Sequence, residues 1–302
     1  MISYFQAIVI GLLQGVTELF PISSLGHSVL LPAWLGWDHL VTAQSADESF
    51  YLAFVVALHV ATALALLVYF RAEWARIIAG FLRTFRTRRI DTPDERLAWL
   101  LVVATIPAGL TGLALEHALR TLFAKPLAAA VFLTVNGLIL LAGERVRRRA
   151  AVRELIVAHP GSPADSGQDP DGSQGRRLDT LDFKEAGAVG IAQIGALFAG
   201  VSRSGITMVA GLVRGLDHED AARFSFLLAT PIILAAGVYK VPDLAGHLGD
   251  GVRGQAAVGA VFAGLAAFVS IRFLLRFFQT RTLMPFAVYS LIVGMLSIIR
   301  FA

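Results

Sequence analysis

Six long apolar stretches dominate the chain, and each has the length of a membrane-spanning helix. A span needs roughly 20 apolar residues, because the hydrocarbon core of a bilayer is about 30 Å thick and an α-helix rises about 1.5 Å per residue. The stretches run approximately over residues 50–70, 97–115, 126–142, 224–239, 256–271 and 283–299. This pattern predicts an all-α polytopic membrane protein with six transmembrane helices.

Two other apolar segments are interrupted by polar and turn-forming residues. Residues 2–20 are followed by 28–35, and residues 186–198 by 207–213. Irregular backbone at membrane depth is tolerated only where protein buries it or where it lines a cavity. We therefore predict two re-entrant helix hairpins, at residues 2–36 and 183–214.

A polar segment rich in Gly, Pro, Ser and Asp, residues 159–179, divides the chain into two halves of the same plan. We expect repeats at 1–145 and 183–302, joined by a cytoplasmic linker at 146–182. Each half is a hairpin followed by three spans, and an odd number of spans inverts the second half relative to the first, which gives an inverted repeat. Four positions recur 179 residues later: Gln14 as Gln193, Ile22 as Val201, Ser23 as Ser202 and Gly26 as Gly205.

Composition and charge agree with a membrane protein. The 302 residues are 56% hydrophobic and 16% charged, whereas soluble domains carry about 25% charged residues. There is no cysteine, which excludes disulfides and thiolate metal sites. Of the 26 Lys and Arg residues, 20 flank the spans on one side and five on the other. Positive charge marks the cytoplasmic side, so this distribution argues against a nucleic-acid-binding face and places both termini outside.

The first interruption, "ELFPISSLGH", holds a charge and several polar groups in an apolar region. Pro21 ends one short helix, and Ser23 or Ser24 is a natural N-cap for the next. His27 lies three residues after Ser24, so both side chains share a helix face and a hydroxyl lies beside a potential base. Glu18 lies on the last turn of the preceding helix and points toward the same break.

The second interruption, "FAGVSRSGIT", has a complementary character. Gly200 permits the turn, Ser202 can cap the following helix, and Arg203, Ser204 and Thr207 occupy its first turns. A helix N-terminus offers unpaired N–H groups and the positive end of the helix dipole. Two such ends meeting with an arginine fork predict a site for a multiply charged anion, and phosphate fits best.

A charge inside a membrane segment costs about 2.5 to 3.5 kcal/mol on insertion scales, so a function is expected to offset it. Alternatives remain open. Glu18 and Arg203 can form a buried ion pair that only holds the hairpins together. Ser23 and Ser202 can act as helix caps alone, and His27 can be a hydrogen-bonded core histidine.

Two polar residues inside the predicted spans are weaker candidates. We expect His59 and Asn136 to make interhelical hydrogen bonds rather than to take part in chemistry.

Three stretches resemble a known family. "QGVTELFPISSLGH" and "GVSRSGIT" are similar to the two signature motifs of the bacterial undecaprenyl-diphosphatases, and "FSFLLATP" resembles a third shared stretch. The resemblance runs over the whole chain. It implies a multi-pass protein of the bacterial plasma membrane that hydrolyses the lipid undecaprenyl diphosphate to the monophosphate. It also implies recycling of the carrier for cell-wall synthesis, bacitracin resistance on overproduction, and an outward-facing pocket between two hairpins.

The family's motif residues fall on named positions of this chain. The resemblance implies catalytic roles for Glu18, Ser24, His27 and Arg203. It places the substrate-binding residues at Gln14, Ser23, Ser202, Ser204, Gly205 and Thr207. The family's first acidic position, Glu or Gln, is glutamine here, which weakens a metal site made of two carboxylates. Two smaller departures are Ala199, where proline is common, and Arg223, where some relatives carry Glu.

The mechanism that follows is a hypothesis. Arg203 and the helix N-termini bind the diphosphate. Ser24 attacks after activation by His27, and water then cleaves the phosphoserine. Glu18 orients His27 or holds a divalent cation, Mg²⁺ or Ca²⁺. In alternative routes His27 itself attacks or activates water. The rival function is a secondary transporter or lipid flippase, because carriers also use inverted repeats with broken helices.

Overall fold

The computed structural model describes residues 2–44, 50–123, 125–158, 176–242, 246 and 249–302. Over these residues the chain is helical, and extended backbone pairs only at a single bridge between Arg176 and Leu216. The principal helices are α1 (Tyr4–Thr17), α2 (Ser24–Trp34), α3 (Asp38–Gln44), α4 (Phe50–Tyr69), α5 (Arg71–Thr87), α6 (Pro93–Phe123), α7 (Pro126–Ala158), α8 (Phe183–Ala192), α9 (Arg203–Val213), α10 (His218–Lys240), α12 (Arg253–Phe277) and α13 (Met284–Phe301), with short 3₁₀ turns η2 (Leu178–Thr180) and η3 (Gln193–Leu197).

Six of these helices are long and apolar enough to cross a bilayer, as the hydropathy pattern predicts. The spans are Phe50–Tyr69, Pro93–Leu115, Pro126–Ala150, His218–Tyr239, Arg253–Phe277 and Met284–Phe301. The predicted fold class, an all-α polytopic membrane protein, is confirmed.

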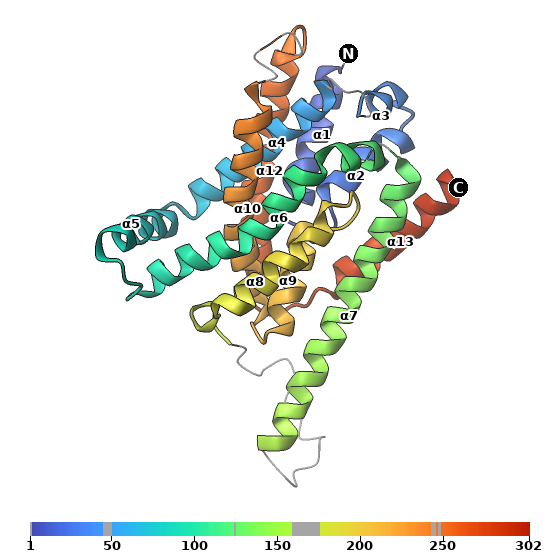
Figure 1. Cartoon of the computed structure of the whole chain (residues 1–302). Coiled ribbons are helices and arrows are strands. Elements are labelled where there is room, and N and C mark those ends of the chain that lie inside the picture. The colour runs from blue at the N-terminus through green and yellow to red at the C-terminus, as the bar shows by residue number, and fades with distance from the viewer. Residues whose placement is uncertain (1, 45–49, 124, 159–175, 243–245, 247–248) are drawn as a thin grey trace.

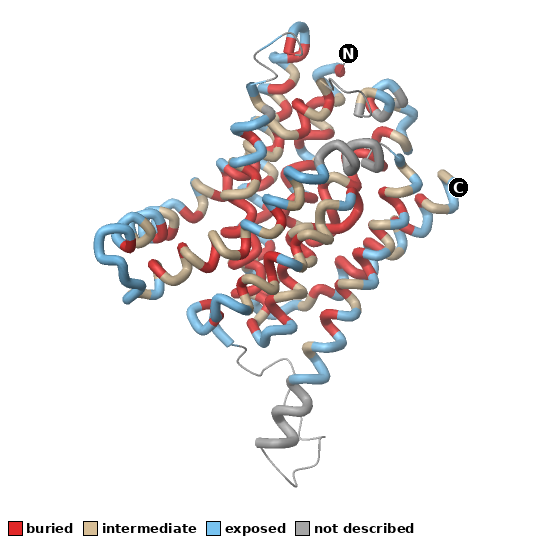
Figure 2. Tube along the Cα trace, viewed as in Figure 1, coloured by how far each residue is buried: buried red, intermediate tan, exposed pale blue. Residues whose placement is uncertain are grey.

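The spans differ in how deeply the protein buries them. The α10 span is 61% buried, whereas those of α6 and α13 are each 28% buried. Figure 2 shows the buried residues gathered at the centre of the bundle, around which the outer helices stand. Large apolar side chains such as Leu113, Val269 and Ile299 are exposed on the outer helices. In a bilayer these side chains face lipid rather than water.

The short helix α1 is held against the long helix α12. A Cβ atom on Gly11 would overlap the backbone carbonyl of Gly259, so the two backbones approach more closely than a larger side chain allows. Small residues permit this kind of helix packing in membranes. The contact fixes the end of α1, which carries the first polar turn, in the middle of the bundle (Figure 1).

The two interrupted segments form short helix pairs. The first is α1 and α2, and the second is α8, η3 and α9. The single helices α1, α2 and α9 have 14, 11 and 11 residues, so each is too short to cross a bilayer by itself. Their re-entrant course and the inverted repeat remain predictions from the sequence.

The structure adds helices that the hydropathy pattern does not predict. Residues 71–96, which the hydropathy pattern leaves as a basic loop between two spans, are mostly the helix α5 followed by the start of α6. In addition, α7 continues to Ala158, so the expected repeat boundary at residue 145 falls inside a helix. A search for long apolar runs passes over both features, because α5 is amphipathic and the end of α7 is rich in arginine. Most of the predicted linker, residues 159–175, lies outside the described part of the chain.

Candidate active site

The first polar turn joins α1 to α2 and carries the acidic residue. Helix α1 ends at Thr17 with Glu18 as its C-cap, and α2 begins at Ser24. Ser23 is the N-cap of α2 and has a φ of 71°, a conformation that is costly for a residue with a side chain. Its hydroxyl accepts hydrogen bonds from the backbone N–H of Gly26 at 3.2 Å and of Gly200, in the other hairpin, at 3.1 Å. The strained backbone thus places the Ser23 hydroxyl where it accepts hydrogen bonds from both hairpins.

The second polar turn joins η3 to α9 and carries the arginine. Gly200 has a φ of +115°, and a Cβ there would overlap the carbonyl of Ala129, so only glycine fits. Ser202 is the N-cap of α9, and its hydroxyl accepts a hydrogen bond from Gly205 N at 3.1 Å. Arg203 is therefore the first residue of α9, at the positive end of the helix dipole.

The two turns lie in direct contact. The Ser204 hydroxyl donates to the carbonyl of Phe20 at 3.2 Å. Asn136, on α7, donates its amide to the Pro21 carbonyl at 2.9 Å and accepts the Ser202 N–H at 2.9 Å. These two bonds tie the turns together through a third helix, and a further bond from Asn136 to the Ser290 hydroxyl of α13, at 3.2 Å, confirms the interhelical hydrogen bonding predicted for it.

At this junction the side chains of both hairpins meet at Glu18. Arg203 Nη2 donates to Glu18 Oε1 at 2.6 Å. The Ser24 hydroxyl donates to Glu18 Oε2 at 2.5 Å, and Gln14 Nε2 donates to the same oxygen at 3.1 Å. These residues come from three different helices, and the site is almost closed: Glu18 is 6% exposed and Ser24 is 8% exposed.

Two buried polar atoms at the junction have no partner among the described residues. They are Arg203 Nη1 and Gln14 Oε1. A buried donor without a partner is costly, which makes Arg203 Nη1 a ready contact for an anionic ligand. This free donor argues against a role for the Glu18–Arg203 pair in structure alone.

His27 lies near the site but does not contact Ser24 through a hydrogen bond. Its Nδ1 is 2.7 Å from the Ser23 carbonyl, and its Nε2 is 2.9 Å from the hydroxyl of Tyr289. A carbonyl only accepts, so Nδ1 carries the proton and Nε2 accepts from the tyrosine. The pairing of Ser24 with His27 expected from their spacing is therefore not formed: sharing a helix face does not decide which neighbour a side chain turns to.

His59, by contrast, reaches the site from α4. Its Nε2 lies 3.1 Å from Glu18 Oε2 and 3.4 Å from the Ser24 hydroxyl. The sequence does contain a signal for it, since a histidine inside an otherwise apolar span is unusual. Tyr289, the partner of His27, has no such signal, because tyrosine is common near membrane interfaces.

The remaining predicted substrate-binding residues support the turns. Thr207 donates its hydroxyl to the Arg203 carbonyl at 2.8 Å and lies 2.6 Å from the hydroxyl of Ser225. Ser202 and Ser204 share a hydrogen bond at 3.0 Å. Ser23 and Ser202 are both N-caps of helices, as one of the two interpretations of the sequence predicts. In this arrangement these side chains shape and position the site.

The residues present do not form a site for a resident metal ion. Among the described residues, no group of three or more His, Cys, Asp or Glu side chains is suitably placed. Both oxygens of Glu18 are already hydrogen-bonded, to Arg203 on one side and to Ser24 on the other. A cation at Glu18 would have to displace these donors, so we place no metal ion there.

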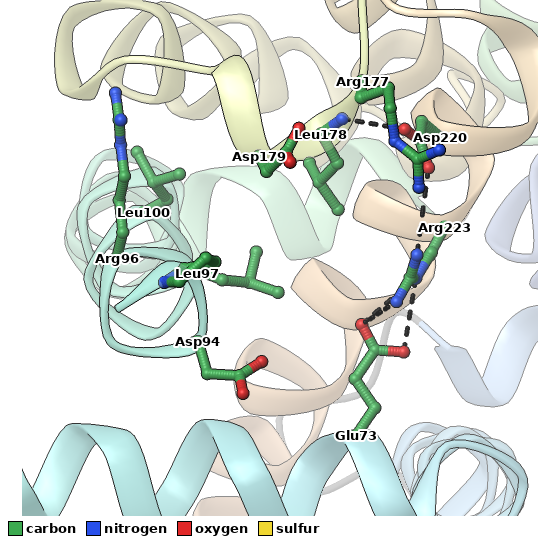
Figure 3. Close-up of a pocket in the computed structure, with 11 residues that line it drawn as sticks. Glu73, Asp94, Arg96, Leu97, Leu100, Arg177, Leu178, Asp179, Asp220 and Arg223 are labelled. Atoms are coloured by element: carbon green, nitrogen blue, oxygen red, sulfur yellow. Dashed lines mark hydrogen bonds and ion pairs between the residues drawn. The ribbon is translucent and has the colours of Figure 1, made fainter. Parts of the chain in front are cut away.

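A cavity of about 120 Å³ lies elsewhere, between the start of α6, η2 and α10 (Figure 3). None of the residues that meet at Glu18 lines it. Arg223 donates to Glu73 across its edge at 2.8 Å, and Asp220 accepts the Leu178 N–H at 2.8 Å. These contacts connect η2 and α5 to α10. The Arg223–Glu73 ion pair lies away from the candidate site.

Comparisons with known proteins agree with the motifs. The sequence profile of the family described as "Bacitracin resistance protein BacA" matches residues 7–296. "Undecaprenyl-diphosphatase 2" of Frankia alni is 59% identical over 100% of this chain and 98% of the relative. "Undecaprenyl-diphosphatase" of Mycolicibacterium paratuberculosis is 55% identical over the same shares. "Undecaprenyl-diphosphatase 2" of Chromobacterium violaceum is 43% identical over 97% of each chain.

Proposed function

Because the chain belongs to the family of the bacitracin resistance protein BacA, we propose that its Glu18 junction is where it hydrolyses undecaprenyl diphosphate. The protein is an integral membrane phosphatase that releases inorganic phosphate and undecaprenyl phosphate, the lipid carrier of cell-wall synthesis. One observation supports the location above all others: the Glu18 carboxylate accepts hydrogen bonds from Ser24 at 2.5 Å and from Arg203 at 2.6 Å, and the three residues come from separate helices.

Binding of the diphosphate follows from the charges at the junction. No described residue bonds to Arg203 Nη1 while Nη2 donates to Glu18, so one guanidinium can contact the phosphoryl group and the carboxylate together. The N-termini of α2 and α9 add their positive dipole ends. The prenyl tail remains in lipid beside the exposed apolar faces of the outer helices.

The reaction proceeds by nucleophilic attack of Ser24. Its hydroxyl proton passes to Glu18 Oε2, its present hydrogen-bond acceptor, while Oγ forms a bond to the terminal phosphorus. The bond from that phosphorus to the bridging oxygen breaks, and undecaprenyl phosphate leaves with the electron pair. Water then attacks the phosphoserine, Ser24 Oγ leaves and regains the proton from Glu18, and inorganic phosphate is released. Arg203 stabilises the charge on the transferring phosphoryl group.

Attack by His27, or activation of water by His27, is less well supported. Both ring nitrogens are engaged, one by the Ser23 carbonyl and one by Tyr289. We propose instead that His27 fixes the start of α2, which carries Ser24.

We propose that the expected divalent cation, Mg²⁺ or Ca²⁺, enters as a counter-ion of the diphosphate. It would neutralise part of the substrate's charge, and Glu18 would keep its present partners.

The topology is also a proposal. The excess of Lys and Arg on one side supports a cytoplasmic linker, two external termini and two re-entrant hairpins that meet between the repeats. The rival function, transport or flipping of a lipid, is not favoured, because the relatives are named for a hydrolytic activity.

The test is phosphate release from undecaprenyl diphosphate by the purified protein in detergent, without a membrane gradient. We expect Glu18→Ala and Arg203→Ala each to lower kcat/KM by at least about 10³-fold, since each loses a charged contact to the reacting groups. Arg223→Ala, which removes a comparable arginine–glutamate pair at the distant cavity, is the matched control and should retain activity.

Turnover close to wild type in Glu18→Ala or Arg203→Ala would remove that residue from the mechanism. Assays with a chelator, followed by addition of Mg²⁺, test the counter-ion: activity should fall and then recover.

A further inference from the structure

His59 reaches the Glu18 carboxylate from outside both hairpins. It extends from the middle of α4, a membrane-spanning helix, and its side chain is 16% exposed. The mechanism above gives it no role. Its Nε2 nevertheless lies 3.1 Å from Glu18 Oε2 and 3.4 Å from Ser24 Oγ, the attacking atom.

The hydrogen bonds of His59 define its protonation. Nδ1 is 2.8 Å from the backbone carbonyl of Val55, which can only accept, so Nδ1 carries a proton. Nε2 faces a carboxylate oxygen, which also accepts. An imidazole with an acceptor at each nitrogen is satisfied only as the doubly protonated cation. The charged groups that face it are Glu18, from the end of α1, and Arg203, from the start of α9.

The same reasoning separates His59 from His27. His27 accepts the tyrosine hydroxyl with Nε2 and therefore holds one proton. Its environment suits a neutral structural histidine, whereas that of His59 suits a proton donor beside the attacking hydroxyl. Imidazole is also the side chain that ordinarily titrates near neutral pH, so it can give up and regain a proton during one turnover.

We propose that His59 is a further catalytic residue, the general acid and base that complements Glu18. This role rests on the proposed function. In the first step, Ser24 gives its proton to Glu18, and His59 Nε2 gives its proton to the oxygen of the departing lipid phosphate. In the second step, neutral His59 takes a proton from the attacking water, and Glu18 returns its proton to Ser24 Oγ. Both residues then regain their starting protonation, and no other reactant is needed.

The experiment compares His59→Gln with wild type in phosphate release from undecaprenyl diphosphate across pH. The glutamine side chain retains an N–H donor for Glu18, so a purely structural role of residue 59 would survive the change. Glutamine cannot take up or release a proton, so a role in proton transfer would be lost. We expect kcat to fall roughly 10²-fold with KM changed little. Wild-type kcat should decline on the alkaline side as His59 loses its proton, and His59→Gln should lack that decline.

Thr62→Val is the matched control. Thr62 lies one turn along α4, is buried, and donates its hydroxyl to the Leu58 carbonyl of its own helix. It should keep the rate and the pH profile of wild type. Addition of imidazole to His59→Ala should restore part of the lost activity, which covers the case in which the glutamine variant does not fold.

The outcomes separate the two proposals. If His59→Gln shows wild-type kcat and the same alkaline decline, His59 is not the acid and base, while the Ser24 mechanism stands. If the imidazole fails to raise the activity of a folded His59→Ala, the same conclusion follows. Wild-type protein that releases no phosphate would overturn the proposed function and the role of His59 with it.

Discussion

At the scale of single residues, Glu18 is the centre of the site. Its carboxylate accepts from Arg203, Ser24 and Gln14 and contacts His59. A carboxylate in so closed a place is stable only when it is paired and hydrogen-bonded. Within the described part of the chain, Arg203 Nη1 has no hydrogen-bond partner. The Glu18 carboxylate therefore has its hydrogen-bond donors, whereas the Arg203 guanidinium still has a donor to offer to an anion.

The nucleophile can be tested at this scale. We expect Ser24→Ala to lower kcat by at least about 10²-fold, because Oγ would form the covalent bond to phosphorus. Ser28→Ala is a control on the same helix, since the Ser28 hydroxyl donates to the Leu25 carbonyl. Acid quenching of wild type during turnover, followed by mass spectrometry, should show a phosphorylated peptide that contains Ser24. A phosphohistidine at His27, or full activity of Ser24→Ala, would contradict the serine route.

At the scale of elements, the site depends on how two turns are capped and joined. The hydroxyls of Ser23 and Ser202 each accept a hydrogen bond from the backbone N–H three residues later, in agreement with the recurrence of the two serines 179 positions apart. Gly26 and Gly200 face each other, and a Cβ on Gly26 would lie 2.9 Å from the Gly200 Cα. Asn136 connects both turns. These contacts hold the turns close enough for Arg203 to reach Glu18.

A second junction between elements secures the start of α8 and is sensitive to pH. Arg176 forms two hydrogen bonds with the Glu185 carboxylate, at 2.8 and 3.2 Å, and also donates to the Arg214 carbonyl. The hydrogen bonds from Arg176 lower the pKa of Glu185 below its ordinary value. The pair thus connects the end of the linker with α8 and with the end of α9.

The expected consequence is a pH-dependent contribution to stability. Because the folded-state pKa of Glu185 is lowered, its contribution is fully present above the unfolded pKa, near 4.5, and is lost as pH falls through the folded value. Glu185→Gln keeps a side-chain oxygen for the cap of α8 but removes the charge. We expect it to destabilise the protein at pH 7 by up to about 1 kcal/mol, and the difference should shrink in acid.

Thermal unfolding of both proteins in detergent, measured from pH 7 down to pH 3, checks this. Glu219→Gln, the same chemical change on α10, is the control. A difference between Glu185→Gln and wild type that stays constant with pH would contradict the charge effect.

At the scale of the whole molecule, the arrangement separates a polar centre from apolar outer helices. Helix α10 is largely buried, whereas α6 and α13 carry exposed residues (Figure 2), and several of these are large and apolar. The termini lie toward the same end of the bundle, and α7 extends past the bundle toward the other end (Figure 1). This is the arrangement expected if the termini are external and the linker is cytoplasmic.

Cysteine labelling tests that orientation directly, because the chain has no cysteine of its own. We expect a membrane-impermeant maleimide to label Ala302→Cys in intact cells from outside. Ser162→Cys, in the predicted linker, should be labelled only after the membrane is opened. The reverse pattern would place the termini inside and the linker outside, and would contradict the proposed topology.

Much of the fold was predictable, because burial in lipid leaves a direct trace in the sequence. The six spans follow from length and hydropathy alone, since a bilayer of fixed thickness demands runs of about 20 apolar residues. Helix α5 could not be found in this way, because an amphipathic helix lacks such a run.

For the site, the sequence by itself determined the candidate groups: Glu18, Ser24 and Arg203 stand out as polar residues in apolar surroundings, at helix breaks where charge is costly. Only the tertiary structure decided their partners. It turned His27 toward Tyr289, 262 positions away, and brought His59 to Ser24 from 35 positions away. The reason is physical: hydrophobic patterning records which residues are buried, whereas a hydrogen bond depends on the packing of separate helices, which no local pattern contains.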